Sequence, residues 1–325
     1  AVRSLELETP GLRPPAYSEL DNRTLDERIA TPHDLRLFAL TEALRRGSTV
    51  DELHDKTDID RYFLSALNEL VQFEQKIERK SLTEELLLQA KSYGFSDETI
   101  ARLCQKDVEQ IRFLRQSWRI RPVYQRVDAC ADASYYYSTY GQEDEREKGE
   151  KPAVIVLGSG PIRIGQGIEF DYATVHAVTE IREAGYEAVI INNNPETVST
   201  DFDISDRLYF EPLHVEDVRH IIEREKPLGI VVQFGGQTSL NLARELDQLG
   251  IPILGTSMHN LNRAEDRQQF ERMLNDLNIR RPEGVTVVTG EAALTVANTL
   301  GYPVLVRPSY VLGGRAMQIV YSDEE

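Results

Sequence analysis

The chain has 325 residues, a length that suggests about two domains, and its 37 basic and 54 acidic side chains give a formal net charge of −17. A protein with this excess of negative charge repels phosphate groups. We therefore expect no extended surface that binds nucleic acid or anionic membranes, although a local basic pocket for a nucleotide is compatible with this charge. A hydrophobic content of 41% excludes a disordered chain and indicates a globular protein.

The two cysteines, Cys104 and Cys130, match no disulfide, zinc or redox spacing, so we expect a reducing, cytoplasmic compartment. The six histidines show no ligand spacing, and we assign no residue to a metal. No apolar run of about 18 residues predicts a membrane span. The sequence starts without an initiator Met or a signal pattern and stops directly after an expected strand, so we expect a fragment of a longer chain.

The N-terminal part is predicted to be helical, with residues 1–20 as a strap and residues 21–130 as an all-helical domain. Thr31-Pro32 is typical of a helix start, and Gly47 of the following stop. Apolar residues at helical spacing between Asp58 and Ile77 predict a long helix.

Two more helix starts are predicted from side chains that cap helices. Ser81 and Glu84 have the spacing of a capping box, and Gly94 is the expected stop of that helix. Further helices are expected from Ser96 and from Asp107.

Residues 131–150 are predicted to be a linker. Tyr135–Tyr140 is followed by GQEDEREKGE, a segment of seven charged residues and no apolar one, which cannot build a core. The tyrosines favour packing of a strap against the next domain; a nucleotide-stacking platform is the alternative.

Residues 151–260 alternate between strands and helices, which predicts a Rossmann-like α/β domain with an open parallel sheet. The expected strands are an apolar run ending at Gly160, Glu187–Asn192, Arg207–Phe210, Gly229–Phe234 and the sequence PILGT. Helices are expected up to Ala184, around 215–224 and over 238–249. In such a sheet, ligands bind beyond the carboxyl ends of the strands.

Residues 261–325 are predicted to begin another domain. We expect helices over 263–277 and 291–300, a strand around 284–288, and a hairpin formed by PVLVRPS and MQIVYS around a Gly-Gly turn.

A glycine loop follows the first apolar strand, from Gly158 to Gly167. A dinucleotide fingerprint requires glycine where Arg163 stands, and Pro161 removes a backbone donor, so a nicotinamide cofactor is disfavoured. Two further polar clusters end strands: the segment from Asn192 to Asp203, and Gly235-Gly236-Gln237-Thr238, whose amides are suited to an anion. For single residues in the first of these, turn and cap chemistry is the alternative.

Arg307 is expected to lie within a strand, beside the apolar residues Val304, Leu305 and Val306, where a guanidinium needs an anion or a carboxylate as partner. The loop Gly313-Gly314-Arg315 is close enough in sequence to fold over a bound anion. A structural ion pair is the alternative for Arg307, and a solvated helix face is the alternative for Arg267, a second candidate.

Taken together, these residues resemble the large subunit of carbamoyl-phosphate synthetase. GSGPIRIGQGIEFDY, NNNPETVSTDFDISDRLYFEP, QFGGQT and GYPVLVRPSYVLGGRAM are similar to the start of its carboxy-terminal half, and KIERK, RPVYQRVDAC and YYYSTY to its oligomerisation domain. The resemblance implies a multidomain fold: an all-α helical domain, an α/β Rossmann-like pre-ATP-grasp domain, and the first part of an ATP-grasp subdomain.

The resemblance also implies an ATP-dependent ligase. The full enzyme makes carbamoyl phosphate from bicarbonate, glutamine-derived ammonia and two ATP, for arginine and pyrimidine synthesis, and the half that starts here phosphorylates carbamate. ATP and Mg²⁺, or Mn²⁺, are the implied cofactors, with the metal ligands expected beyond residue 325. The implied partners are a small glutamine amidotransferase subunit or domain and a second copy of the chain.

Six site residues are carried over from the family. Arg307 matches a catalytic and ATP-contacting position, and Arg267, Gly313 and Gly314 match ATP-binding positions. Glu169 and Glu196 match carboxylates that line the passage of carbamate. Two other functions stay open: an oligomerisation or interaction module only, and a nucleotide-binding Rossmann protein such as an NAD-linked dehydrogenase. We expect the fragment itself to be inactive.

Overall fold

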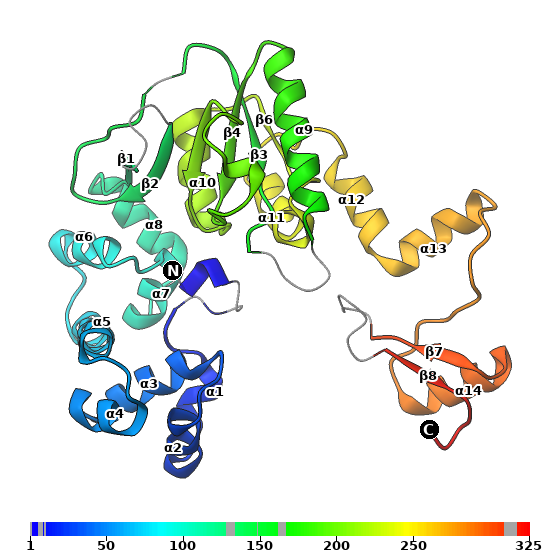
Figure 1. Cartoon of the computed structure of the whole chain (residues 1–325), viewed down its shortest axis with the longest axis horizontal. Coiled ribbons are helices and arrows are strands. Elements are labelled where there is room, and N and C mark those ends of the chain that lie inside the picture. Colours follow the sequence, from blue (N-terminus) through cyan, green and yellow to red (C-terminus); the bar gives the residue numbers. More distant parts are fainter. Residues whose placement is uncertain are drawn as a thin grey trace.

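The structure is a computed structural model that describes residues 2–5, 9, 11–127, 134–147, 149–161, 167–308 and 317–325. Figure 1 shows three parts: a helical domain, an α/β domain, and a C-terminal unit from residue 266 onward. Among the described residues, no helix combines the length and the apolar character that crossing a membrane requires.

Capping side chains set most helix starts in the helical domain. Ser96 and Asp107 accept backbone N–H groups at the starts of α7 and α8, as predicted, and Gly47 and Gly94 end their helices at φ +100° and +82°. The helical elements are η1 (Val2–Leu5), α1 (Pro15–Ser18), α2 (Asn22–Ala30), α3 (Arg36–Arg45), α4 (Val50–Thr57), α5 (Arg61–Arg79), α6 (Glu84–Ser92), α7 (Asp97–Cys104) and α8 (Val108–Ser117).

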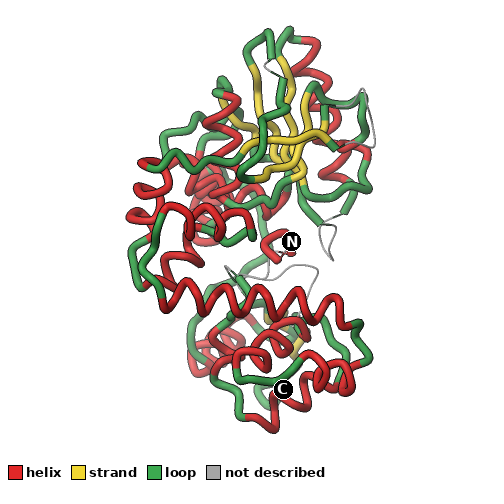
Figure 2. The backbone as a smooth tube through the Cα atoms, turned by 90° about the vertical axis from the view of Figure 1, so that its left-hand side faces the viewer, coloured by secondary structure: helices red, strands yellow, loops and turns green. Residues whose placement is uncertain are grey.

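The long helix α5 joins two hydrophobic cores. Leu64 and Val71 are buried with α1 to α4, whereas Phe73 and Ile77 are buried with α6 to α8. The apolar side chains recur at helical spacing along one face, so a single helix supports both halves of the domain. Figure 2 shows helices gathered below the strands of the large sheet.

Two predicted caps in this domain are wrong. Thr31 is the C-cap of α2, and α3 begins five residues later without a side-chain cap. The cap of α6 is Thr83, whose hydroxyl accepts from Leu86 N at 3.2 Å, not Ser81. At α6 the sequence offers two hydroxyl residues two positions apart, and the spacing of the capping box favoured the wrong one; at α3 no side chain caps the helix.

The α/β domain is built on one six-stranded sheet in the order β1-β2-β5-β4-β3-β6. Strands β2 to β6 are parallel to their neighbours, and β1 pairs antiparallel with β2. The strands are β1 (Val123–Arg126), β2 (Tyr135–Thr139), β3 (Ala153–Leu157), β4 (Glu187–Asn192), β5 (Arg207–Phe210) and β6 (Gly229–Val231); the helices are α9 (Glu169–Glu183), η2 (Val198–Thr200), α10 (Val215–Glu225), α11 (Gly236–Gln248) and α12 (Met258–Glu265).

Both faces of the sheet are covered, which explains its apolar strands. Ile155 and Leu157 of β3 pack with α10 and α11, while Val156 between them packs with Val178 of α9 on the opposite face. Alternate residues of a strand point to opposite faces, so a strand buried on both sides has no polar positions. The predicted Rossmann-like α/β domain is confirmed.

The sheet extends further toward the N-terminus than predicted. The segment expected to be a linker contains β2, in which Tyr136 is buried, and residues 123–126 of the expected all-helical region form β1. The charged segment after β2 packs against the α/β domain, because Arg146 in that segment donates two hydrogen bonds to Glu225, at 2.7 and 2.8 Å. Conversely, PILGT contributes only a bridge between Ile253 and Ile230.

The C-terminal unit comprises α13 (Arg267–Asp276), α14 (Gly290–Leu300), β7 (Val304–Val306) and β8 (Gln318–Val320). The two strands pair antiparallel, which confirms the predicted hairpin; its Gly-Gly turn lies outside the described residues. The strand expected around 284–288 is absent from the described chain, where that segment is irregular. None of the described residues from 266 onward is buried.

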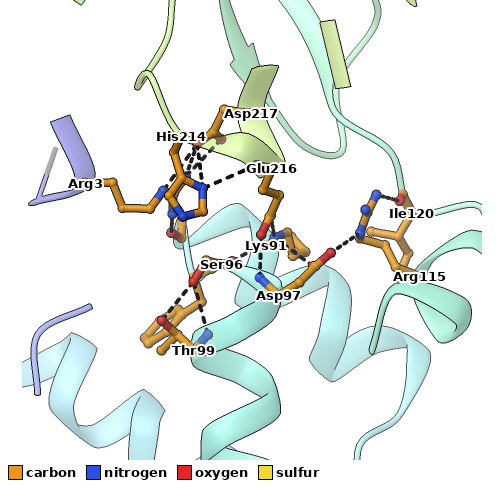
Figure 3. A network of polar contacts seen from close by, with 12 residues as sticks. Arg3, Lys91, Ser96, Asp97, Thr99, Arg115, Ile120, His214, Glu216 and Asp217 are labelled. Atoms are coloured by element: carbon orange, nitrogen blue, oxygen red, sulfur yellow. Dashed lines mark hydrogen bonds and ion pairs between the residues drawn. The ribbon is translucent and has the colours of Figure 1, made fainter. Parts of the chain in front are cut away.

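Ion pairs join the helical domain to the α/β domain (Figure 3). The ammonium of Lys91 on α6 lies 2.5 Å from Glu216 Oε1 on α10 and 3.1 Å from Asp97 Oδ1, and Asp97 N donates to Glu216 Oε2 at 2.7 Å. Arg115 on α8 and Arg3 complete this interdomain charged cluster, which consists of Arg3, Lys91, Asp97, Arg115, Glu216 and Asp217.

The opposite charges in this buried cluster stabilise one another's ionised forms. Burial raises the pKa of the Glu216 carboxyl, but the charge and hydrogen bond of Lys91 outweigh it and leave that pKa lowered. The neighbouring His220 is buried, and burial together with Arg115 lowers its pKa to about 3, so its ring is neutral. The Nε2 atom of His220 forms no hydrogen bond with any described group.

The carboxyl of Glu211, next to the cluster, has no cation of its own among the described residues to balance its charge. Glu211, just after β5, lines a cavity of about 120 Å³ together with Arg3, Lys91, Glu216, Asp217 and His220. Burial, and then the negative charge of Asp217, raise the pKa of Glu211 to about 7, against the backbone N–H of Ser138 and the charge of Arg3. With three cations and three other carboxylates in the cluster, ionised Glu211 leaves a net charge of −1.

We predict that Glu211→Gln stabilises the protein at alkaline pH. A carboxyl whose pKa is higher in the folded state binds more protons there, so its contribution to the free energy of unfolding falls as pH rises from about 4.5 to 7. The variant is expected to be about 2–3 kcal/mol more stable than wild type at pH 8 and less than about 1 kcal/mol more stable at pH 5.

Chemical denaturation at a series of pH values measures this difference. Glu85→Gln, at an exposed carboxylate on α6, is the control and is expected to change stability little at any pH. A Glu211→Gln variant that is less stable than wild type at pH 8 contradicts the assignment.

Candidate functional site

The carboxyl edge of the sheet gathers three of the predicted polar segments. In the order β4-β3-β6, the chain runs outward from β3 on both sides, so the carboxyl ends of β3 and β6 mark the switch point at which ligands bind in such sheets. Gly158 follows β3, Asn192 ends β4, and Gly235 precedes α11. The sequence analysis placed these segments at strand ends, and the structure brings them together.

The two glycine loops touch at this switch point. A Cβ atom added at Gly235 would lie 2.3 Å from the carbonyl oxygen of Gly158 and 2.7 Å from that of Leu157. Both distances are too short for any side chain, so Gly235 is required by the close approach of two backbones. Gly158 is restricted in the same way, because its Cβ would lie 2.5 Å from Asn192 Cγ.

Asn192 connects the first loop to the second. Its Oδ1 accepts from Gly160 N at 3.1 Å and from Asn193 N at 2.9 Å. The side chain is almost completely buried, and no described group accepts from its Nδ2. These bonds are turn chemistry, so Asn192 shapes the loop; residues 162–166 of the glycine loop, including Arg163, lie outside the described part of the chain.

The loop after β4 is fastened to α9. Asp171 Oδ1 accepts from Ser199 N at 3.0 Å, and Thr200 Oγ1 donates to Asn194 O at 3.1 Å. Asn194 Oδ1 in turn accepts from Glu196 N at 3.0 Å. Asp171 was not predicted as a site residue, because an acidic residue in the first turn of a helix is common and gives no specific signal.

The two predicted passage carboxylates lie on these fastened segments. Glu196 belongs to the loop after β4, and Glu169 is the first residue of α9, two positions before Asp171. Both side chains are exposed, and Glu169 Oε1 accepts from Gly167 N at 3.3 Å. The bond between Asp171 and Ser199 therefore draws the segments that carry both carboxylates to one side of the sheet.

The predicted nucleotide residues lie in the C-terminal unit. Arg307 follows β7 by one residue rather than lying within a strand, and it is exposed beside Leu305 and Val306, which are 58% and 51% exposed. The desolvation argument for Arg307 is therefore wrong for this chain: its guanidinium lies in water and forms no ion pair with a described residue. Arg267, the first residue of α13, is half-buried and likewise unpaired among the described residues; Gly313 and Gly314 lie outside them.

No group of three or more His, Cys, Asp or Glu side chains among the described residues is arranged to hold a metal ion.

Comparison with solved structures finds biotin carboxylases. The chain is 21% identical to the biotin carboxylase domain of the Hydrogenobacter thermophilus 2-oxoglutarate carboxylase in complex with MgADP, ADP and bicarbonate; the match covers 54% of this chain and 39% of that one, with a TM-score of 0.42. Rhizobium etli pyruvate carboxylase is 17% identical over 54% of this chain and 16% of its own, with a TM-score of 0.38. This chain thus spans well under half of either structure.

Three family models match in succession and together cover most of the chain. Residues 1–119 match the carbamoyl-phosphate synthetase large-chain oligomerisation domain, residues 150–263 the carbamoyl phosphate synthase pre-ATP-grasp domain, and residues 266–325 the ATP-binding domain of the carbamoyl-phosphate synthase L chain. The first corresponds to the helical domain, the second to the α/β domain, and the third to the C-terminal unit. The chain therefore belongs to the carbamoyl-phosphate synthetase large-chain family.

Proposed function

We propose that this chain is part of an ATP-dependent ligase that forms carbamoyl phosphate, and that its α/β domain and C-terminal unit belong to the half that phosphorylates carbamate. The observation that carries the proposal is the succession of three matches to domains of one family, in the order of the observed parts. The convergence of three loops at the carboxyl edge of the sheet supports it, because this is where such sheets bind ligands.

The proposed step is a phosphoryl transfer. A carbamate oxygen attacks the γ-phosphorus of ATP, a new O–P bond forms, and the bond from that phosphorus to the β–γ bridging oxygen breaks to release ADP. Such a reaction depends on positioning and on neutralising phosphate charge. Arg307 is proposed as the catalytic, ATP-contacting cation, with Arg267, Gly313 and Gly314 as further ATP-binding residues.

Mg²⁺, or Mn²⁺, would neutralise phosphate charge in this chemistry. The described residues hold no fitting group of ligands, so we assign the ion no residue here and derive no step through it.

Glu169 and Glu196 are proposed to line the route by which carbamate arrives. Their position on two segments joined by the bond between Asp171 and Ser199 supports a shared role. Carboxylates repel a bare anion, so we propose that they hydrogen-bond neutral carbamic acid or its amine. Replacing Glu196 by Gln tests this step through the pH dependence of coupling between the two halves of the enzyme.

The proposal extends to partners and pathway. A glutamine amidotransferase subunit or domain would supply ammonia, and the product would enter arginine and pyrimidine synthesis in the cytoplasm. Self-association through the helical domain is supported by the match to an oligomerisation domain.

A second candidate function is an oligomerisation module without catalysis by this chain. It is favoured by one observation: the helical domain has its own two cores, whereas Arg267 and Arg307 stand apart from any described anion-binding group. Calorimetric titration of the 325-residue chain with ATP distinguishes the two. Turnover by this chain alone is not expected, because Arg307 is exposed to water, where charge contacts are weak.

We predict that, in the full-length enzyme, Arg307→Ala lowers the rate of ATP formation from carbamoyl phosphate and ADP by about 30- to 1,000-fold. The reason is that a charge-assisted contact in a closed phosphoryl-transfer site contributes about 2–4 kcal/mol to the transition state. Bicarbonate-dependent ATP hydrolysis, which reports the other half, is expected to stay near the wild-type rate.

Arg280→Ala is the matched control, since Arg280 is an exposed arginine of the same unit outside the proposed site. Equal loss of both half-reactions in Arg307→Ala, or no loss in either, would remove Arg307 from the proposed site.

We also predict that the chain self-associates through its helical domain. Tyr62 and Phe63 at the start of α5 are 76% and 61% exposed, with ring centroids 5.4 Å apart, and exposed aromatic pairs are typical of interface cores. Sedimentation velocity over a concentration series is expected to show a dimer or larger species, weakened in Tyr62→Ser/Phe63→Ser. Phe270→Ser, on α13, is the control. A wild-type chain that stays monomeric at every concentration refutes the prediction.

A further inference from the structure

The N-terminal segment η1 lies between the helical domain and the α/β domain. Figure 1 draws this segment beside α7 and below the sheet, and in Figure 2 the end marked N likewise lies below the strands of the sheet. Two consecutive residues of this segment make contacts with three other parts of the chain. These contacts connect the interdomain charged cluster to the loop after β4.

Arg3 forms the first connection. Its guanidinium donates to Asp217 Oδ1 at 2.9 Å and to Asp217 Oδ2 at 3.0 Å, on the first turn of α10. The same group donates to the carbonyl oxygen of Gly94, at the end of α6, at 3.0 Å. One side chain thus bonds both domains, and only 17% of it is exposed (Figure 3). Such bidentate pairing fixes direction as well as distance.

Ser4 forms the second connection. Its carbonyl oxygen accepts from Asn193 Nδ2 at 3.1 Å, and Asn193 is the first residue after β4. The next residue, Asn194, accepts a hydrogen bond from the backbone N–H of Glu196 through its side chain. Arg3 and Ser4 are consecutive residues of one short 3-10 turn, and their contacts hold it at both sides. A shift of the backbone of η1 therefore changes the contact with Asn193 as well as the contact with Asp217.

We propose that η1 is a strap that couples the packing of the helical domain to the conformation of the loop 193–200, with Arg3 and Asn193 as its two positioning residues. The strap fixes one end of the loop, and the bond from Ser199 to Asp171 fixes the other. A change in how the helical domain sits on α10, such as one imposed by self-association, would reach the loop by this path. As regulation of a carbamate passage, the inference rests on the proposed function; the coupling itself does not.

Hydrogen–deuterium exchange of the 325-residue chain, read from peptides that cover 193–201, tests the coupling. In Arg3→Gln the loop amides are expected to exchange about 2- to 30-fold faster, the range that corresponds to a coupling energy of about 0.5–2 kcal/mol. Asn193→Ala is expected to produce a similar increase. In the double variant the two effects should not add, because both remove the same connection.

Arg13→Gln is the matched control: Arg13 also lies near the N-terminus and donates to Glu78 at 2.6 Å, within the helical domain, and its loss should leave the loop unchanged. Unchanged loop exchange in Arg3→Gln, or additive effects in the double variant, would overturn the proposal. Faster exchange confined to residues near Gly94 and α10 would also overturn it, since that pattern indicates a purely local role.

The pH dependence of stability provides a second readout. Arg3 faces Asp217 and Glu211. Burial raises the pKa of both carboxyls, as do the negative charges of Glu216 on Asp217 and of Asp217 on Glu211, and the charge of Arg3 opposes that rise. Arg3→Gln is therefore expected to steepen the loss of stability as pH rises, whereas Arg3→Lys keeps the charge and should restore the wild-type profile. Equal profiles for Gln and Lys would contradict a role for this charge.

These measurements need no nucleotide, so they separate the coupling from the proposed function. If Arg3→Gln loosens the loop while Glu196→Gln leaves carbamate transfer unchanged in the full-length enzyme, the strap stands and the passage assignment fails. If loop exchange is unchanged in Arg3→Gln, the strap fails whatever the enzyme assay shows.

Discussion

The buried ion pair between Lys91 and Glu216 is the constraint on which the arrangement of the two large domains depends. Their side chains are 2% and 6% exposed, and charges so far from water are tolerated only when they are paired and hydrogen-bonded. Lys91 also bonds Asp97 and the carbonyl oxygen of Phe95, so all its donors are directed at fixed acceptors. The helical domain thus has one precise position on α10.

This position determines what happens at the carboxyl edge of the sheet. Glu216 and Asp217 lie in the first turn of α10, directly after the loop from β5, so the cluster is a neighbour of the strand ends where the glycine and asparagine loops meet. Arg3 binds Asp217 of the cluster, and the adjacent Ser4 accepts a hydrogen bond from Asn193 in the loop after β4. The C-terminal unit contrasts with this region, because none of its described residues is buried: Arg307 is exposed and Arg267 only half-buried.

The sequence predicts most regular elements because their signals are local. Strands β4 and β5 have the predicted bounds, and the starts of α7 and α8 follow from their capping side chains. Strand β2 could not be predicted in the same way. Its tyrosines fit a strand or a strap equally well, and only pairing with β5, some seventy positions later in the chain, decides between them.

The candidate site also consists of residues that local sequence signals predict and residues that they do not. Glycine and asparagine clusters at strand ends indicate the carboxyl edge, and the structure places Gly158, Asn192 and Gly235 together there. Lys91 and Glu216 give no such signal, because they are 125 positions apart and a helix with charged residues is usually a solvated one. Arg307 shows the opposite error: apolar neighbours in sequence suggested burial, yet the hairpin that bears it is not covered by any described layer.

The most direct test of this account is equilibrium unfolding of Lys91→Met. Trp118, the single tryptophan, follows α8 and reports the helical domain by fluorescence, while amide exchange in β4 reports the α/β domain. Loss of Lys91 leaves Glu216 buried without its cation, which costs about 3–5 kcal/mol. The account predicts coincident midpoints in wild type and two separated midpoints in the variant. Coincident midpoints at wild-type stability in Lys91→Met would contradict it.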